Sequence, residues 1–336
     1  MEPERDGTDE AHDADDVDDA GEARRRLLRW IGATGAVAAA ARAAPVGAAP
    51  VSAVGPVRIL VGRPPAGTLD VVARTLALKW QARSGRRHLV ENRTGASGLL
   101  ALRALADAPT DGSVMLLASR RQLETAPGAA TPVDMRANGP AIVGEVAATG
   151  LVLACGPQVP AAIRSVDALV AWVRTAAVAP LCGNDGDGAL ADEIARRFAA
   201  AAGLALSHVA YRDEVAALRE AAAGEVAMAI GTEGSVLPIV RAGRLRAIAI
   251  AGAARSPFAP GVATFDEAGY RGLELRERFV AALPDGAAAP VVGALSDAIR
   301  AALRDGDVRD VWSRLALSRP PEASAGAPPP AQPTGR

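Results

Sequence analysis

Short apolar runs alternate along the chain with longer segments whose apolar residues recur every three or four positions. Runs of the first kind predict buried strands, and segments of the second kind predict amphipathic helices. The first such unit pairs a strand at 57–62 with a helix at 71–83, in which Val72, Leu76 and Trp80 share one face. This unit is a strand followed by its crossover helix.

The ends of that helix carry their own signals, because Thr68 and Asp70 suit an N-terminus and Gly85 suits a C-terminal cap. The same alternation continues to about residue 317. Further strands are expected at 88–91, 113–118, 141–145, 151–155, 207–211, 226–230 and 245–251. Further helices are expected at 99–106, 166–176, 189–202, 214–223, 291–303 and 307–315. The pattern predicts an α/β protein with parallel sheets built from strand–helix–strand units.

The two ends of the chain differ from its body. Residues 1–21 are acidic and almost free of apolar side chains, and residues 319–336 are rich in Pro, Ala and Gly, so neither segment can bury enough surface to fold. The order Arg24-Arg25-Arg26-Leu27-Leu28-Arg29, followed by an Ala/Gly run at 31–41, is typical of a twin-arginine export signal. That run is too short to span a bilayer. We expect export to the periplasm; a leader without export is the alternative.

The composition allows two lobes, because 336 residues with 50% hydrophobic and 22% charged side chains suffice for two cores. The net charge of -1 hides an asymmetry: residues 1–43 hold 11 acids and 6 arginines, and the rest holds 31 basic and 27 acidic residues. Aromatic residues are only 3%, and no basic stripe interleaves with them. Nucleic-acid binding is therefore not expected.

Signals for catalysis are thin. His88 and His208 lie within strand patterns, and the sequence has no phosphate-binding loop, dinucleotide fingerprint, nucleophile elbow or cluster of metal ligands. Cys182 has no evident partner base, and Cys155 and Cys182 could form a disulfide or remain two buried thiols. We expect no enzyme activity, no cofactor and no metal.

Two loops carry a resemblance to a known family. Arg63-Pro64-Pro65-Ala66-Gly67-Thr68-Leu69-Asp70 leaves the first strand, and Val90-Glu91-Asn92-Arg93-Thr94-Gly95-Ala96 lies at the end of the next. This order resembles the substrate-binding proteins of tripartite tricarboxylate transporters, the Bug family, which show a Pro-Pro-Gly-Gly-x-x-Asp loop and a Val-Glu-Asn-Arg-Pro-Gly-Ala segment. Weaker matches continue in the same order to about residue 317.

The resemblance implies a type II periplasmic-binding-protein fold: two α/β lobes joined by crossover strands, with a ligand cleft between them. We expect the first lobe at 55–148 plus 254–318, the second at 149–253, a head and signal at 1–43 and a disordered tail at 319–336. The implied function is capture of a small organic acid by hinge closure for a membrane transporter or a sensor. We expect a monomer.

Ligand-binding residues are expected in three loops, which approach the cleft from strand ends. A carboxylate suits such loops because helix N-termini present amide N–H groups and a positive dipole end. The candidates are Pro65, Ala66, Gly67, Thr68 and Asp70, then Ser119, Arg120 and Arg121, and in the second lobe Asn184, Asp185, Gly186 and Asp187. Asp70 could equally cap its own helix.

The departures from the family pattern leave alternatives open. Ala66 stands where the family has glycine, and the family's Gly-x-Gly-Ser-x-x-His-Leu loop is replaced by Gly183-Asn184-Asp185-Gly186-Asp187-Gly188-Ala189-Leu190. Arg120 and Arg121 could bind an anion or pair with these aspartates. A zwitterionic ligand facing Asp70, Asp185 and Asp187 is conceivable, as is a degenerate interaction protein that binds no solute. The loop lacks the glutamate of an EF-hand calcium site.

Overall fold

A computed structural model of the protein describes residues 55–95, 98–125, 139–186 and 189–320. The expected acidic head, export signal and tail lie outside these residues, as does Asp187. Within them, none of the helices is both long and apolar enough to cross a membrane.

The first lobe is built on three parallel strands in the order β2-β1-β3. The sequence predicted the bounds of these three strands to within two residues. Its elements are β1 (Val57–Val61), α2 (Thr68–Ser84), β2 (His88–Asn92), α3 (Leu99–Ala106), β3 (Val114–Ser119), α4 (Arg120–Thr125), α9 (Ala289–Arg304) and α10 (Gly306–Arg314). Helix α2 starts three residues before the predicted position, at Thr68, and ends as predicted at Gly85, whose φ is 69° and whose N–H bonds to the carbonyl of Gln81.

The second lobe repeats the design with the parallel order β6-β5-β7. Its elements are α5 (Val166–Thr175), β5 (Leu181–Asn184), α6 (Leu190–Ala202), β6 (Ser207–Ala210), α7 (Glu214–Ala223), β7 (Met228–Thr232), α8 (Glu233–Arg241) and β8 (Arg246–Ala251). Strand β5 and helix α8 were not predicted, because Leu181–Asn184 is very short and α8 contains Pro238.

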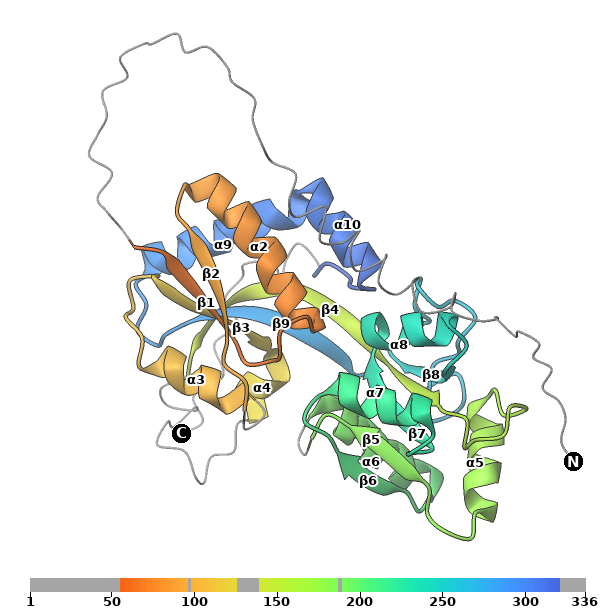
Figure 1. Cartoon of the computed structure of the whole chain (residues 1–336). Helices are drawn as coiled ribbons and strands as arrows, with labels where there is room; N and C mark the ends of the chain where they lie inside the picture. The colour runs from red at the N-terminus through yellow and green to blue at the C-terminus, as the bar shows by residue number, and fades with distance from the viewer. Residues whose placement is uncertain (1–54, 96–97, 126–138, 187–188, 321–336) are drawn as a thin grey trace, which may run out of the picture. The chain divides into compact units, whose positions relative to one another are not determined.

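Helices cover both faces of each sheet region (Figure 1). In the first lobe, α2, α9 and α10 pack on one face and α3 on the other. In the second lobe, α5 and α6 pack on one face and α7 and α8 on the other. Phe265 and Leu273, which follow β8, belong to the second core. The lobe boundaries given from the sequence stay a prediction.

Two long strands join the lobes. Strand β4 (Ala141–Cys155) pairs with β9 (Arg276–Leu283) through residues 141–150 and with β7 and β8 through residues 151–155. Strand β9 also pairs antiparallel with β3, so the path is β2-β1-β3-β9-β4-β7-β5-β6. The sequence predicted β4 as two separate strands and did not predict β9, whose Arg276-Glu277-Arg278 start is too polar for an apolar run.

The two cysteines are buried free thiols. Cys155 of β4 and Cys182 of β5 are both in register with Met228 of β7, which lies between them. Two strand spacings place their Cα atoms roughly 10 Å apart, beyond the roughly 7 Å that a disulfide can bridge. Burial raises the pKa of each thiol to about 12, so neither has the thiolate character of a nucleophile.

Gly150 lies where β4 passes from one sheet region to the other. Its N–H donates to Glu233 Oε1 at 3.0 Å, and a Cβ there would lie 2.1 Å from the same oxygen. Glu233 is itself buried and also accepts a hydrogen bond from Ser256. Only glycine allows this close approach, so a glycine is required where β4 passes from one lobe to the other.

We predict that Gly150→Ala lowers the free energy of unfolding by about 1–3 kcal/mol, because the new methyl group must displace a buried carboxylate. Urea unfolding measures this change. Gly293→Ala is the matched control: Gly293 lies exposed in α9 with nothing within 4 Å of its Cβ position. There alanine should add about 0.5–1 kcal/mol. Equal effects at both sites would contradict the role given to Gly150.

Candidate functional site

A cavity of about 270 Å³ lies at the carboxyl ends of β1, β5 and β7, between elements of the two lobes. Ligand sites of open α/β sheets occur at such strand ends. The first lobe contributes the segment 63–69 with Glu277 and Phe279 of β9. The second lobe contributes Leu151, Asp185, Ala191, Arg212, Asp213, Glu214, Val215, Arg219 and Thr232.

The loop from Arg63 to Thr68 forms the first-lobe wall. Pro64 and Pro65 restrict its backbone, and Ala66 adopts a left-handed φ of 66°, a conformation that glycine takes without strain. Helix α2 then begins at Thr68, and its N-cap residue Gly67 supplies no side-chain cap. The N–H groups of its first turn and the positive end of its dipole therefore lie at the cavity wall.

Asp70 holds this loop from behind. It is 2% exposed, does not line the cavity and accepts hydrogen bonds from Ala66 N at 2.9 Å and Asn92 Nδ2 at 2.9 Å. Arg74 pairs with it at 2.9 Å. Although burial opposes its ionisation, the hydrogen bonds from Arg74, Ala66 and Asn92 lower the pKa of Asp70. Asp70 thus fixes the shape of the loop, and its side chain does not line the cavity.

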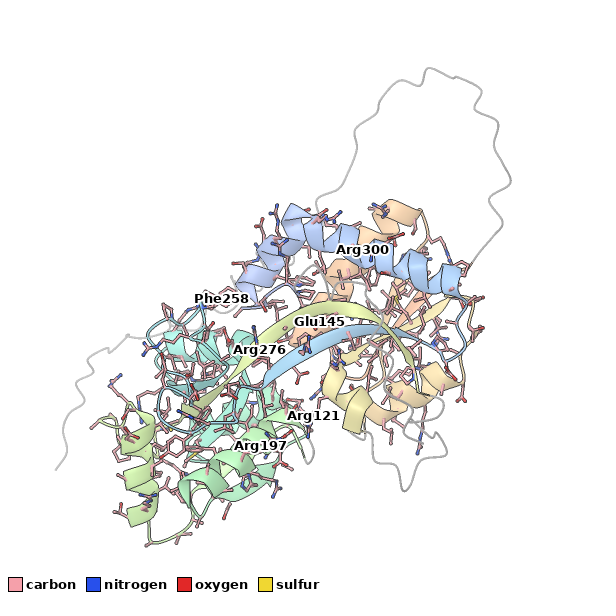
Figure 2. The ribbon with its side chains drawn as sticks, turned by 180° about the vertical axis from the view of Figure 1, so that it is seen from behind. Arg121, Glu145, Arg197, Phe258, Arg276 and Arg300 are labelled. Carbon is pink, nitrogen blue, oxygen red and sulfur yellow. The ribbon has the colours of Figure 1, made fainter. Side chains whose placement is uncertain are left out.

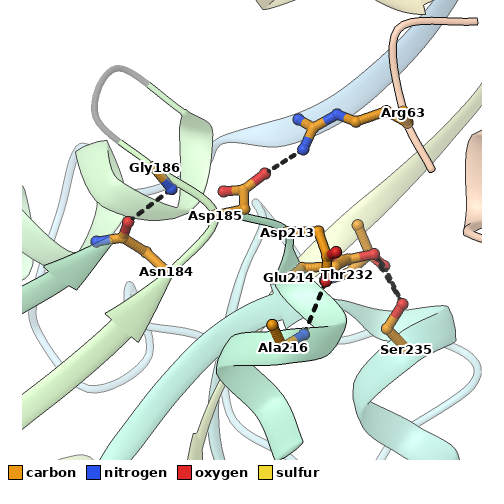
Figure 3. Close-up of polar contacts among 9 residues, drawn as sticks. All are labelled: Arg63, Asn184, Asp185, Gly186, Asp213, Glu214, Ala216, Thr232 and Ser235. Carbon is orange, nitrogen blue, oxygen red and sulfur yellow. Dashed lines mark hydrogen bonds and ion pairs between the residues drawn. The ribbon is translucent and has the colours of Figure 1, made fainter. Parts of the chain in front are cut away.

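The second-lobe loop is organised by Asn184, whose Oδ1 accepts from Gly186 N at 2.9 Å and whose Nδ2 donates to Asp192 at 3.1 Å. This turn presents Asp185 to the cavity, where Arg63 Nη1 lies 2.8 Å from Asp185 Oδ2 (Figure 3). The pair joins the two lobes, and its side chains are 28% and 11% exposed. Asp185 therefore has a partner in Arg63. Asp187, the other aspartate considered as a partner for Arg120 and Arg121, lies outside the described residues.

The third predicted loop stands apart from the cavity. Ser119 ends β3, is buried, and donates its hydroxyl hydrogen to Glu277. Arg120 and Arg121 begin α4 and do not line the cavity. Arg121 Nη2 lies 2.6 Å from Glu193 Oε2 of the second lobe. Glu193 also pairs with Arg197, so three charges meet there, and the two arginines are seen close together in Figure 2.

Two further acids, one half-buried and one buried, complete the cavity. Glu214, the first residue of α7, accepts from Thr232 N at 2.9 Å, from Thr232 Oγ1 at 3.1 Å and from Ser235 Oγ at 2.8 Å (Figure 3). Burial raises the pKa of Glu214, and those hydrogen bonds oppose the rise. Glu277 of β9 is 8% exposed, and burial raises its pKa to about 7 against the hydrogen bond from Ser119 and the charge of Arg63.

The sequence missed several of these residues for identifiable reasons. Arg63 belongs to the loop that leaves the first strand, and its position after a strand end could have identified it as a candidate site residue. Glu214 and Thr232 also follow strand ends. Glu277 had no such signal, because the strand that carries it was not recognised. Its place beside the cavity results from the pairing of β9 with β3 and β4.

This architecture, with two α/β lobes joined by crossover strands around a cavity, is that of the periplasmic binding proteins. The structure of periplasmic binding protein BugD matches it with a TM-score of 0.71 and 24% identity, covering 79% of this chain and 88% of that one. MatC from Rhodopseudomonas palustris with bound malate matches with a TM-score of 0.72 and 23% identity, covering 82% and 92%. The fold class expected from the sequence is confirmed.

The sequence comparisons identify the family. Residues 72–317 match the family described as the tripartite tricarboxylate transporter family receptor. Protein BugT of Bordetella pertussis is 31% identical over 275 residues, which are 79% of this chain and 83% of that protein. The chain belongs to the tripartite tricarboxylate transporter receptor family. Its members are solute-binding receptors of the periplasm and not enzymes.

We predict that Glu277→Gln stabilises the ligand-free protein at pH 8. The raised pKa means that the folded state binds more protons than the unfolded state between pH 4.5 and 7, so the free energy of unfolding falls as the pH rises through that window. The glutamine variant avoids a loss of up to roughly 3 kcal/mol. Urea unfolding at pH 4.5, 6 and 8 measures the difference, which should be small at pH 4.5. A variant less stable than the parent at pH 8 would refute this.

Proposed function

We propose that this chain is an extracytoplasmic solute-binding protein that captures a small organic acid between its lobes and presents it to a membrane transporter of the tripartite tricarboxylate type or to a sensor. The observation that carries the proposal is the cavity at the strand ends, whose wall includes the uncapped first turn of α2. Arg212 and Arg219 lie on the same cavity from the second lobe. Both groups favour a negative ligand group.

In this proposal one carboxylate of the solute docks on the amides of Thr68 and Leu69 in the first turn of α2. The loop is rigid before binding, because Pro64, Pro65 and the buried Asp70 hold it, so little conformational entropy is lost when the ligand arrives. The cavity of about 270 Å³ lies just below the usual range of small-molecule sites and suits an acid of few carbon atoms. Malate, which is named with MatC, is a suitable first probe.

Closure in this proposal is a hinge motion of the two lobes on β4 and β9, which supply the strand connections between them. The ion pairs Arg63–Asp185 and Arg121–Glu193 each join one lobe to the other. The protein acts as a monomer in the periplasm, and the twin-arginine-type segment at 24–29 supports export by that route.

A second candidate function is favoured by the same ion pairs. Because Arg63 and Asp185 already satisfy one another across the cavity, the lobes could be held together without a solute, and the chain would then act as a ligand-independent interaction protein. A thermal unfolding screen with dicarboxylates, aromatic acids and amino acids separates the two. A ligand at 100 times its dissociation constant should add about 2.7 kcal/mol of stability. No shift with any acid would favour the interaction protein.

We predict that Thr68→Val weakens the acid with the largest shift in that screen by roughly tenfold, because a hydroxyl donor next to the docked carboxylate is lost. Calorimetric titration measures the affinity. Thr75→Val is the matched control on the same helix: its hydroxyl bonds to the carbonyl of Val71 at 2.8 Å, outside the cavity. Equal affinities for both variants and the parent would remove Thr68 from the site.

We predict that Glu193→Gln weakens the same acid by up to roughly tenfold while changing stability by less than about 1 kcal/mol, because it removes the charge that draws Arg121 toward the second lobe. The control is Glu91→Gln, whose partner Arg58 lies 2.6 Å away within the first lobe. If both variants lowered the affinity equally, the effect would not come from a contact between the lobes.

A further inference from the structure

The buried part of the cavity wall carries more acids than bases. Among the described lining residues, the only base that is not exposed is Arg63, whereas Asp185, Asp213, Glu214 and Glu277 are all buried or half-buried. Asp213 pairs with Arg212 at 3.3 Å. Arg212 and Arg219 are exposed. Arg63 neutralises Asp185, with which it pairs at 2.8 Å. Two carboxyl groups therefore remain in the wall of a cavity that would bind an acid, and their charge opposes a ligand that is only negative.

Glu277 is the group whose bonding is incomplete. Glu277 lines the cavity and is 92% buried, and Ser119 donates a hydrogen bond to its carboxylate. Among the described residues, its buried Oε1 has no hydrogen-bond partner, and the same holds for Asp185 Oδ1. A buried acceptor without a donor costs about 1–3 kcal/mol, more when it is charged. A donor group on a bound solute would remove this cost.

Glu214 differs from Glu277 in this respect. Three donors from Thr232 and Ser235 surround its carboxylate, so its hydrogen bonds are supplied by the second lobe itself. Its charge nevertheless acts on Glu277, as does that of Asp185, and both raise the pKa of Glu277. The three acids therefore share one electrostatic environment, into which a cation would be drawn.

We propose that Glu277, with Asp185 and Glu214 beside it, forms a subsite for an ammonium group, so that the solute is a small amino acid or a similar acid carrying an amine. This proposal rests on the proposed function, since the carboxylate of the same molecule docks on the α2 turn. An ammonium group offers three donors and no acceptor, which matches the unpartnered oxygens of Glu277 and Asp185. Arg212 and Arg219 line the same cavity as exposed bases.

The competing arrangement is a protonated Glu277 that donates its hydrogen to a ligand carboxylate. Burial raises the pKa of Glu277 to about 7, which makes either form accessible at neutral pH. The two arrangements differ in the direction of proton movement. An ammonium group favours the ionised carboxylate, so binding releases a proton, whereas a second carboxylate favours the neutral acid, so binding takes a proton up.

The test is calorimetric titration of the full chain at pH 7 with pairs of acids that share a carbon skeleton and differ by one ammonium group: L-aspartate and succinate, L-glutamate and glutarate, L-2-aminoadipate and adipate. We expect at least one amino acid to bind roughly tenfold or more tightly than its partner. Repeating the titration in phosphate and in Tris, whose ionisation enthalpies differ, gives the number of protons exchanged. We expect proton release with the amino acid.

Glu277→Gln should weaken that amino acid by roughly 10- to 100-fold, abolish the proton release and strengthen binding of the partner acid, because it removes a negative charge that opposes a second carboxylate. Glu145→Gln is the matched control, because Glu145 is a 5% exposed acid on the neighbouring strand β4 that pairs with Arg278 at 2.7 Å and does not line the cavity. It should leave both affinities unchanged.

The outcomes separate the two proposals. If succinate, glutarate or adipate binds as tightly as its amino acid, or binds with proton uptake, the proposed function stands and the ammonium subsite is wrong. If an amino acid binds more tightly but Glu277→Gln leaves its affinity unchanged, the subsite is also wrong. If no acid of either kind binds, the proposed function fails, and the ammonium subsite fails with it.

Discussion

The structure depends on one strand that belongs to two sheet regions. Strand β4 pairs with β9 up to Gly150 and with β7 and β8 from Leu151 onward, so its 15 residues must satisfy both lobes without a break. At that point Glu233 accepts the N–H of Gly150, and a side chain there would crowd its carboxylate. The two hydrophobic cores lie on either side of this point, and the cavity lies between them. The lobes are therefore continuous through this strand, and the ion pairs Arg63–Asp185 and Arg121–Glu193 add further links between them.

Charge distribution gives the cavity its second constraint. The α2 turn favours a negative group, while Asp185, Glu214 and Glu277 disfavour one. Burying a carboxylate costs free energy unless donors surround it, and the three acids differ in the donors that they have. Asp185 has Arg63, Glu214 has three hydrogen bonds, and Glu277 retains an oxygen with none. Such unequal compensation is expected where a site is built for a ligand and not for stability alone.

The sequence predicted the alternating framework well, because α2 buries Leu69, Val72, Leu76 and Trp80 at helical spacing and its neighbours are short apolar strands. It could not predict β9, since a strand that begins Arg276-Glu277-Arg278 has no apolar periodicity and is specified by its partners. The candidate loops were placed from strand ends, and the residues Pro65–Thr68 and Asp185 do line the cavity. Glu277 could be found only after the register of β9 with β3 and β4 was known.

The departures from the family pattern gain a common explanation from this geometry. An aspartate at 185, where the family has glycine, would repel a carboxylate by itself, but it lies 2.8 Å from Arg63 on the opposite lobe. Ala66, in place of glycine, keeps a left-handed φ because Asp70 binds its amide. At both positions the backbone freedom of a glycine is lost, and a contact made by an aspartate side chain takes its place. The proposed recognition therefore relies more on side-chain charge than a glycine-rich site would, and charge can distinguish an amino acid from the dicarboxylate of the same shape.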